Sequence, residues 1–176
     1  MKVYLLGYMG SGKSTVGKML ADQLQMNFLD FDRYIEKETG KTIPEIFDSL
    51  GEDKFRELEH THLKNVLHLE DTVISLGGGT PCFHNNIDLI NSSGTSVYIE
   101  MAVDELVKRL ANARNKRPLI RGLNDAELKL FIEANLEKRK PVYEKAHFSV
   151  NATTLSAEQA AATIAKNLKD KISRGR

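Results

Sequence analysis

The segment GYMGSGKS at residues 7–14 restricts the fold of this chain more than any other stretch. It matches the full pattern G-x-x-x-x-G-K-[ST], with an apolar run before it at residues 2–6 and an amphipathic segment after it at residues 13–25. Glycines at this spacing let backbone N–H groups point at phosphate oxygens, and the first turn of a helix adds its positive dipole end. The segment therefore predicts a strand, a phosphate-binding loop and a helix that together bind a nucleoside triphosphate.

This loop supplies the candidate nucleotide-binding groups. Lys13 is a mobile cation for the β- and γ-phosphates, and Ser14 offers a hydroxyl to Mg²⁺. A chance glycine-rich turn is the alternative, but the strand before the loop and the helix after it argue against one. The candidate nucleotide-binding residues in the loop are Gly10, Ser11, Gly12, Lys13, Ser14 and Thr15.

Short apolar runs alternate with amphipathic segments along the rest of the chain. Strands are expected at residues 2–6, 27–31, 72–76, 95–100 and 147–150. Helices are expected at residues 13–25, 32–39, 43–68, 85–91, 103–111, 124–140 and 156–172, with breaks at Gly40 and Gly51. This alternation predicts an α/β three-layer sandwich whose sheet is mainly parallel. The chain shows no repeat or linker, so residues 1–176 are expected to form a single domain.

Net charge, the length of apolar stretches and the cysteine count indicate which binding partners and which cellular compartment to expect. Lys and Arg number 25 against 24 Asp and Glu, so the net charge of +1 gives no bulk attraction for nucleic acid or for an anionic membrane. No stretch approaches the roughly 18 apolar residues of a membrane span. Cys82 is the one cysteine, so an internal disulfide is impossible and a reducing, cytoplasmic compartment is expected.

Two carboxylates follow the second expected strand. Asp30 and Asp32 lie at i and i+2 of an extended segment, which directs both side chains to one face at the carboxyl edge of the sheet. One could hold Mg²⁺ through water, and the other could accept a hydroxyl proton from an acceptor molecule. The alternative is that Asp32 only caps the helix that begins at Arg33.

Further residues could form an acceptor site. The glycines Gly77, Gly78 and Gly79 follow the third expected strand, where backbone could touch a ligand, although a flexible turn is the alternative. Arg56 and Arg139 could bind a carboxylate through two hydrogen bonds each. For Arg56 the alternative is a surface ion pair with the acidic residues at i+1 and i+3, and for Arg139 a contact with the end of its helix. If both arginines face one pocket, the acceptor carries a carboxylate.

An aperiodic basic stretch, residues 112–123, interrupts the helical pattern. A mobile segment that carries arginines next to a phosphate loop is typical of a lid. Its closure would exclude water and bring Arg117 to the transferring phosphoryl group. An ordinary solvated loop is the alternative.

Taken together, these motifs resemble the shikimate kinases, and they follow one another in the order found in that family. They are GYMGSGKST at 7–15, LDFD at 29–32, IPEIFDSLGEDKFRELE at 43–59, SLGGGT at 75–80, RPLI at 117–120 and EKRKPVYEKAH at 137–147. The phosphate loop alone is shared by many proteins, but its conjunction with the other motifs is specific. The resemblance covers nearly the whole chain.

The resemblance implies a kinase that transfers the γ-phosphoryl group of ATP to the 3-hydroxyl of shikimate in aromatic amino-acid biosynthesis. It implies a P-loop kinase fold with a five-stranded parallel sheet of order 2-3-1-4-5 flanked by helices, an acceptor-binding helical segment at about 32–60 and a lid at about 112–123. Carried over by motif, the shikimate-binding residues would be Asp32, Arg56, Gly77, Gly78, Gly79 and Arg139. Asp32 would orient or deprotonate the hydroxyl, while Lys13 and Arg117 would face the transferring phosphate. Ser14 would ligate Mg²⁺ directly, with Asp30 in its outer shell.

On the adenine side the resemblance implies an arginine that stacks on the base. Arg109 is the best match and Arg114 the alternative, and the loop at 151–154 departs from the family pattern. The rival functions are a gluconate kinase-like small-molecule kinase and a nucleotide-binding regulatory module without catalysis. We expect small-molecule partners only, ATP and shikimate, and a monomer, because no long exposed apolar stripe is found.

Overall fold

Five parallel strands form one sheet in the computed structural model, which describes residues 1–113 and 117–174 of the chain. The strand order is β2-β3-β1-β4-β5, which confirms the expected order 2-3-1-4-5. The strands are β1 (Lys2–Leu6), β2 (Asn27–Asp30), β3 (Thr72–Ser75), β4 (Thr95–Glu100) and β5 (Phe148–Asn151). The central strand β1 is buried from Val3 to Leu6, as expected for a strand covered by helices on both faces.

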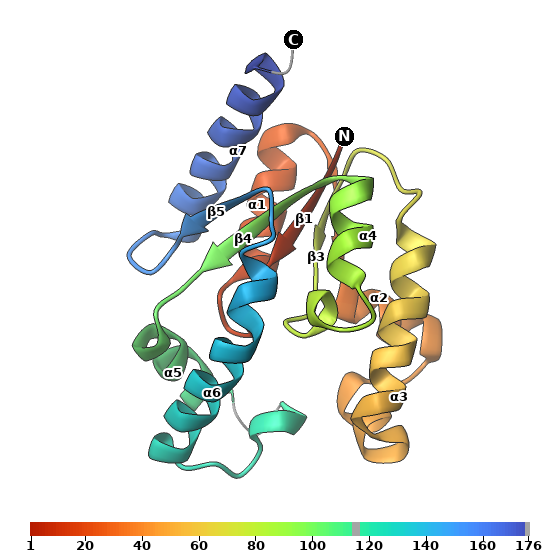
Figure 1. Cartoon of the computed structure of the whole chain (residues 1–176), viewed down its shortest axis with the longest axis vertical. Coiled ribbons are helices and arrows are strands. Elements are labelled where there is room, and N and C mark those ends of the chain that lie inside the picture. The colour runs from red at the N-terminus through yellow and green to blue at the C-terminus, as the bar shows by residue number, and fades with distance from the viewer. Residues whose placement is uncertain (114–116, 175–176) are drawn as a thin grey trace.

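Helices pack on both faces of this sheet (Figure 1). They are α1 (Lys13–Leu24), α2 (Phe31–Thr39), α3 (Ile43–Val66), α4 (Asn86–Ser93), α5 (Val103–Ala111), α6 (Asp125–Tyr143) and α7 (Ala157–Arg174). Two short 3₁₀ turns, η1 (Thr80–Cys82) and η3 (Pro118–Ile120), lie in segments for which the sequence pattern predicts no helix. Across the described residues, no helix is both long and apolar enough to cross a bilayer.

The core is built mainly from the strands and from helix stripes that the spacing predicts. In α1 the residues Val16 and Leu20 are buried, and α1 packs against α7. In α7 the buried stripe is Ala160, Ile164 and Leu168. Because these residues recur every four positions, each helix turns one face to the core and leaves its charged face in water.

Helix α6 extends further than the sequence predicts. Its expected end was residue 140, before Pro141, but the helix continues to Tyr143 with Pro141 inside it. A proline removes one backbone donor, which costs little in a last turn whose final residue is held by packing. Tyr143 is fully buried, and its ring lies 5.1 Å from that of Tyr98. This packing keeps the turn helical and moves Arg139 one turn inside the helix end.

Helices α2 and α3 form an arm beside the carboxyl edge of the sheet. A capping box of Thr42 and Glu45 starts α3, and Gly51 kinks it with φ 81° and ψ 172°, at the break expected there. Figure 1 places α3 on one side of this edge and α6 on the other, with the turn η3 between them at the lower end. The strands therefore deliver their last residues into a space bounded by the phosphate loop, the arm and the segment around η3.

Candidate active site

The phosphate loop has the backbone conformation that its glycines allow. Gly10 and Gly12 have φ of 83° and 86°, in the left-handed region where other residues are strained. Lys13 begins α1, and its Nζ donates hydrogen bonds to the carbonyl oxygens of Gly7 and Tyr8, both at 2.9 Å. Burial lowers the pKa of Lys13 to about 8, although the charge of Asp32 opposes this shift. The ammonium group is thus held at the loop, within reach of an anion that enters it.

A cavity of about 380 Å³ opens in front of this loop. Its lining includes the candidate nucleotide-binding residues Gly10, Gly12, Lys13, Ser14 and Thr15, together with Asp30, Asp32 and Arg117. Ser11, also a candidate, is buried within the loop instead of lining the cavity. The loop, the end of β2 and the predicted lid therefore enclose one polar space.

Asp30 and Asp32 are positioned differently from the sequence prediction. The strand β2 ends at Asp30, and α2 begins at Phe31, so the two aspartates do not share the face of one strand. The cap of α2 is Asp30, whose Oδ1 accepts a hydrogen bond from the backbone N–H of Arg33 at 3.3 Å, and the capping alternative for Asp32 is wrong. The other oxygen, Oδ2, accepts from the Ser14 hydroxyl at 2.6 Å. Asp30 thereby joins the helix start to the phosphate loop.

Asp32 lies in the first turn of α2 and lines two cavities. Burial raises its pKa to about 6, and the charges of Glu59 and Asp30 act in the same direction. Lys13 and Arg117 oppose the shift. A carboxylate with this pKa is mostly ionised at neutral pH and can still take up a proton, which suits a general base.

The second cavity, of about 320 Å³, begins where the first one ends. Both are lined by Met9, Asp32, Gly77, Gly78 and Arg117. The second is also lined by Arg56, Gly79 and Arg139, and by apolar residues that include Phe47 and Leu119. A phosphate chain in the first cavity and an acceptor in the second would therefore meet at Asp32 and Arg117.

Arg56 is buried in the wall of the second cavity and only 5% exposed. Its Nη1 donates to Glu59 Oε2 at 2.6 Å and its Nη2 to Glu52 Oε1 at 2.8 Å. The guanidinium carbon lies 4.5 Å from the centre of the Phe83 ring. The ion pair at i+3 that the sequence offered as an alternative thus exists, but it is buried and part of the cavity wall.

Arg139 is 7% exposed and faces the same cavity from α6. Its guanidinium carbon lies 5.5 Å from the centre of the Tyr8 ring, in a cation–π contact. Among the described residues, no carboxylate forms an ion pair with Arg139. Because Arg56 already has two carboxylate partners, Arg139 carries the less compensated positive charge of the two.

The three glycines leave space for the groups around them. A Cβ on Gly77 would lie 2.7 Å from Asp32 Oδ1, and one on Gly79 would lie 2.5 Å from Arg56 Nη1. On Gly78 it would lie 3.0 Å from the backbone nitrogen of Met9. The Tyr143 hydroxyl also donates a hydrogen bond to the Gly78 carbonyl. The absence of side chains at these glycines therefore lets Asp32, Arg56 and the backbone of Met9 lie close to this segment. This packing explains the three glycines without a flexible turn.

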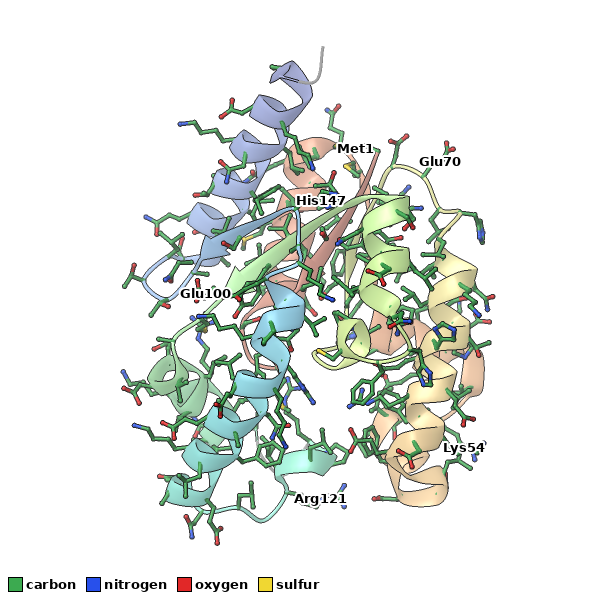
Figure 2. The ribbon with its side chains drawn as sticks, viewed as in Figure 1. Met1, Lys54, Glu70, Glu100, Arg121 and His147 are labelled. Atoms are coloured by element: carbon green, nitrogen blue, oxygen red, sulfur yellow. The ribbon has the colours of Figure 1, made fainter. Side chains whose placement is uncertain are left out.

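The predicted lid contributes to the second cavity. Arg117, Pro118 and Leu119 line it, and Ile120 is fully buried. Figure 2 shows Arg121 at the lower end of the molecule, on the side of this segment that faces α3. Its Nη1 lies 3.8 Å from Asp48 Oδ2 on α3. The segment is therefore in contact with the acceptor side rather than free in solvent.

Of the two arginine candidates for the adenine side, Arg109 lies within the described residues, on α5. Its Nη1 lies 3.5 Å from where a Cβ of Gly12 would be, and its Nε pairs with Glu105 Oε1 at 2.9 Å. Arg114, the alternative, lies outside the described residues. Arg109 does not line either cavity, but it borders the phosphate loop on the side of α5.

Comparison with known proteins identifies the family. The sequence model of the shikimate kinase family matches residues 9–169. The chain belongs to the shikimate kinase family. A shikimate kinase of Parabacteroides distasonis is 45% identical over 157 residues, which cover 89% of this chain and 91% of that protein.

Solved structures of shikimate kinases agree with this assignment. The one from Bacteroides thetaiotaomicron is 40% identical, with a TM-score of 0.90 over 96% of this chain and 98% of that chain. The one from Acinetobacter baumannii, in complex with shikimate, is 33% identical, with a TM-score of 0.90 over 97% and 93% of the two chains. The P-loop kinase fold expected for the chain is therefore confirmed.

Several groups at this shikimate kinase site were not predicted from the sequence. Glu59 is 1% exposed and binds Arg56, but its spacing of i+3 indicated only a surface ion pair. Tyr8 and Phe83 support the two arginines through their rings, and no sequence pattern distinguishes such a ring from a core aromatic residue. The Thr80 hydroxyl donates to Glu59 Oε1 at 2.5 Å, a contact between residues 21 positions apart that no local pattern signals.

Proposed function

We propose that this chain transfers the γ-phosphoryl group of ATP to the 3-hydroxyl of shikimate, giving shikimate 3-phosphate and ADP in aromatic amino-acid (chorismate) biosynthesis. The observation that carries the proposal is the meeting of the two cavities at Asp32 and Arg117. Membership of the shikimate kinase family supports it, as does the relative from A. baumannii whose structure holds shikimate.

The acceptor would bind through its carboxylate and its hydroxyl groups. Arg139, which has no carboxylate partner among the described residues, would take most of the carboxylate charge, and Arg56 would add hydrogen bonds from a fixed position. The backbone of Gly78 and Gly79 would touch the ligand at close range. Phe47 and Leu119 would cover the apolar face of the ring. This arrangement fits a small carboxylic acid with a hydroxyl directed towards Asp32.

The transfer itself needs a base and positive charge. The hydroxyl oxygen of the acceptor would attack the γ-phosphorus, its proton would pass to the Asp32 carboxylate, and the β–γ bridging oxygen would leave with ADP. Lys13 and Arg117 would balance the charge that develops on the phosphoryl oxygens. The chain would thus act by positioning and charge neutralisation, without a covalent intermediate.

A magnesium ion fits the oxygen donors next to the loop. The Ser14 hydroxyl lies 2.6 Å from Asp30 Oδ2 and 3.2 Å from the Ser75 hydroxyl, and oxygen atoms are the ligands that Mg²⁺ prefers. We propose Ser14 as a direct ligand and Asp30 as a partner through water. When bound with ATP, the ion would neutralise charge on the β- and γ-phosphates.

On the nucleotide side we propose that Arg109 stacks on the adenine, because its guanidinium borders the loop at Gly12. We also propose that residues 112–123, of which 114–116 lie outside the described residues, act as a lid. We propose a monomer as the working form, because the sequence shows no long exposed apolar stripe. The single cysteine, Cys82, leaves the chain without an internal disulfide and supports a cytoplasmic location.

The experiment is the release of ADP from Mg·ATP by the purified protein, with shikimate, gluconate or no acceptor in parallel. Turnover that depends on shikimate and is absent in the other two assays is expected. Turnover with gluconate alone would keep the phosphate-loop roles and contradict the acceptor roles. Nucleotide binding without turnover in any of the three assays would favour a regulatory module. Sedimentation at assay concentration tests the monomer.

A further inference from the structure

A polar network connects the Arg56–Glu59 pair to a turn between β3 and α4, of which only Thr80 belongs to one of the motifs. The turn spans residues 80–86, ending at the first residue of α4, and contains η1. It touches the pair at two points: the Thr80 hydroxyl donates to Glu59 Oε1 at 2.5 Å, and the Phe83 ring lies 4.5 Å from the Arg56 guanidinium carbon. Where this turn lies therefore decides where Arg56 and Glu59 lie.

Asn86 holds both of these points. Its side-chain N–H donates to the Thr80 carbonyl at 2.7 Å, and its backbone N–H donates to the Phe83 carbonyl at 2.9 Å. The residue is fully buried, with an exposed fraction of 0%. A buried side-chain amide destabilises the fold unless its N–H donors and its oxygen form hydrogen bonds. The Asn86 Oδ1 atom is therefore expected to accept a hydrogen bond as well.

That partner is His60. The distance from His60 Nδ1 to Asn86 Oδ1 is 2.6 Å. Because the Asn86 amide nitrogen donates to Thr80, its oxygen must accept, and His60 must carry a proton on Nδ1. Both the neutral Nδ1–H tautomer and the imidazolium meet this requirement. The bond therefore persists whether or not Nε2 is protonated.

The hydrogen bonds of this network join α3 and α4. His60 follows Glu59 on α3, while Asn86 is the first residue of α4, so the chain of contacts returns to the helix that carries Arg56. His84 and Asn85, directly before Asn86, have φ of 51° and 56°, which residues other than glycine adopt rarely. Such a backbone persists where the surrounding contacts fix it. The bonds of Asn86 supply that fixation.

We propose that His60 and Asn86 are positioning residues of the acceptor site, which hold the turn at residues 80–86 and through it the Arg56–Glu59 pair. The inference rests on the proposed function, since it assigns Arg56 to the acceptor. Neither residue lines either of the two cavities described above, so each acts through Thr80 and Phe83 and not by touching the acceptor. A rigid anchor keeps the guanidinium in its binding geometry before the acceptor arrives.

The test compares His60→Leu, His60→Asn and Asn86→Leu with the wild type in the ADP-release assay. His60→Leu removes the donor, whereas the side-chain nitrogen of His60→Asn can occupy the place of Nδ1. The loss of a hydrogen bond is worth about 1 kcal/mol, so KM for shikimate is expected to rise about fivefold in His60→Leu. KM for ATP and kcat are expected to stay within about twofold, and His60→Asn is expected to restore KM for shikimate.

Asn86→Leu should raise KM for shikimate as His60→Leu does. Combining the two substitutions should add little, because they break one network.

The matched control is His68→Leu, the same substitution on an exposed histidine just beyond α3. It is expected to leave both KM values unchanged. An unchanged shikimate KM in His60→Leu, an equal rise in both KM values, or a His60→Asn variant as impaired as His60→Leu would each overturn the inference. If Asn86→Leu does not fold, the two variants of the half-exposed His60 still test the proposal. Absence of shikimate turnover by the wild type would overturn the proposed function itself, whereas normal turnover with an unaffected His60→Leu would overturn the positioning role alone.

Discussion

Gly79 lies directly against the guanidinium of Arg56. A Cβ at position 79 would come within 2.5 Å of Nη1 and 2.7 Å of the central carbon. Arg56 has little room to give way, because Glu59 and Glu52 bind it on one side and Phe83 covers its face. Arg56 can therefore occupy its place only because residue 79 has no side chain.

Gly79→Ala is therefore expected to displace Arg56 and weaken acceptor binding. We expect KM for shikimate to rise about tenfold or more, since overpacking a fixed site costs about 1–3 kcal/mol. KM for ATP should change little, because Gly79 does not line the nucleotide cavity. Steady-state kinetics with each substrate varied in turn checks this. An alanine variant with a normal shikimate KM would contradict the role given to Arg56.

Asp32→Asn is expected to affect turnover and stability in opposite directions. Loss of a general base lowers rates by about a hundredfold or more, so kcat should fall while ATP binding is retained. The folded protein raises the pKa of Asp32 to about 6, so it favours the protonated form over the charged one. The stability linked to Asp32 is therefore present at low pH and is lost as pH rises through 6. The variant should melt higher than the wild type near pH 8 and no higher near pH 4, which thermal denaturation at both values measures.

The activity should depend on pH through two groups of opposite charge. Asp32 loses its function as a base when it is protonated, below its pKa of about 6, and Lys13 loses its charge above its pKa of about 8 in the free protein. We expect a bell-shaped profile of kcat/KM for ATP between these values. Bound phosphates stabilise the ammonium form, so the alkaline limb of kcat should lie higher. A flat profile from pH 5 to pH 9 would contradict these roles.

The fold was predictable where local pattern decides it, and the site only in part. Apolar runs gave the strands, and the glycine spacing gave the phosphate loop, because both depend on neighbours in the sequence. The strand order came from the resemblance alone. The aspartates show the limit: both were expected on one face of an extended segment, but a helix that starts at Phe31 leaves Asp30 as its cap and places Asp32 in its first turn. No periodicity resolves a boundary of one residue.

Long-range contacts explain what the sequence could not show. The end of α6 depends on the burial of Tyr143 beside Tyr98, 45 positions away, which outweighs the breaking effect of Pro141. The pairing of Asn86 with His60 and Thr80 likewise joins α4, α3 and a turn. Such contacts exist only once the sheet has brought the elements together, so no window of sequence contains them.

Arg139→Lys is expected to weaken acceptor binding without harming the nucleotide site. A lysine keeps the positive charge but loses the planar fork that binds a carboxylate through two hydrogen bonds and stacks over Tyr8. KM for shikimate should rise about tenfold, a loss of about 1.4 kcal/mol. Isothermal titration with shikimate in the absence of nucleotide separates this effect from turnover. Unchanged shikimate affinity would place the carboxylate elsewhere.

The pair Arg121–Asp48 is expected to hold the lid against the acceptor side. It joins residues on either side of the second cavity at 3.8 Å, and both side chains are exposed, at 48% and 63%. Exposed pairs contribute at most about 1 kcal/mol, so Asp48→Arg should raise KM for shikimate by no more than about fivefold. The effect should fade in high salt, where exposed charges are screened. Adding Arg121→Asp to this variant should restore the wild-type value.

The control is Lys54→Asp, which breaks the exposed pair with Glu57 on the same helix and should leave KM for shikimate unchanged. A double variant as impaired as the two single variants combined would show that the two residues act separately.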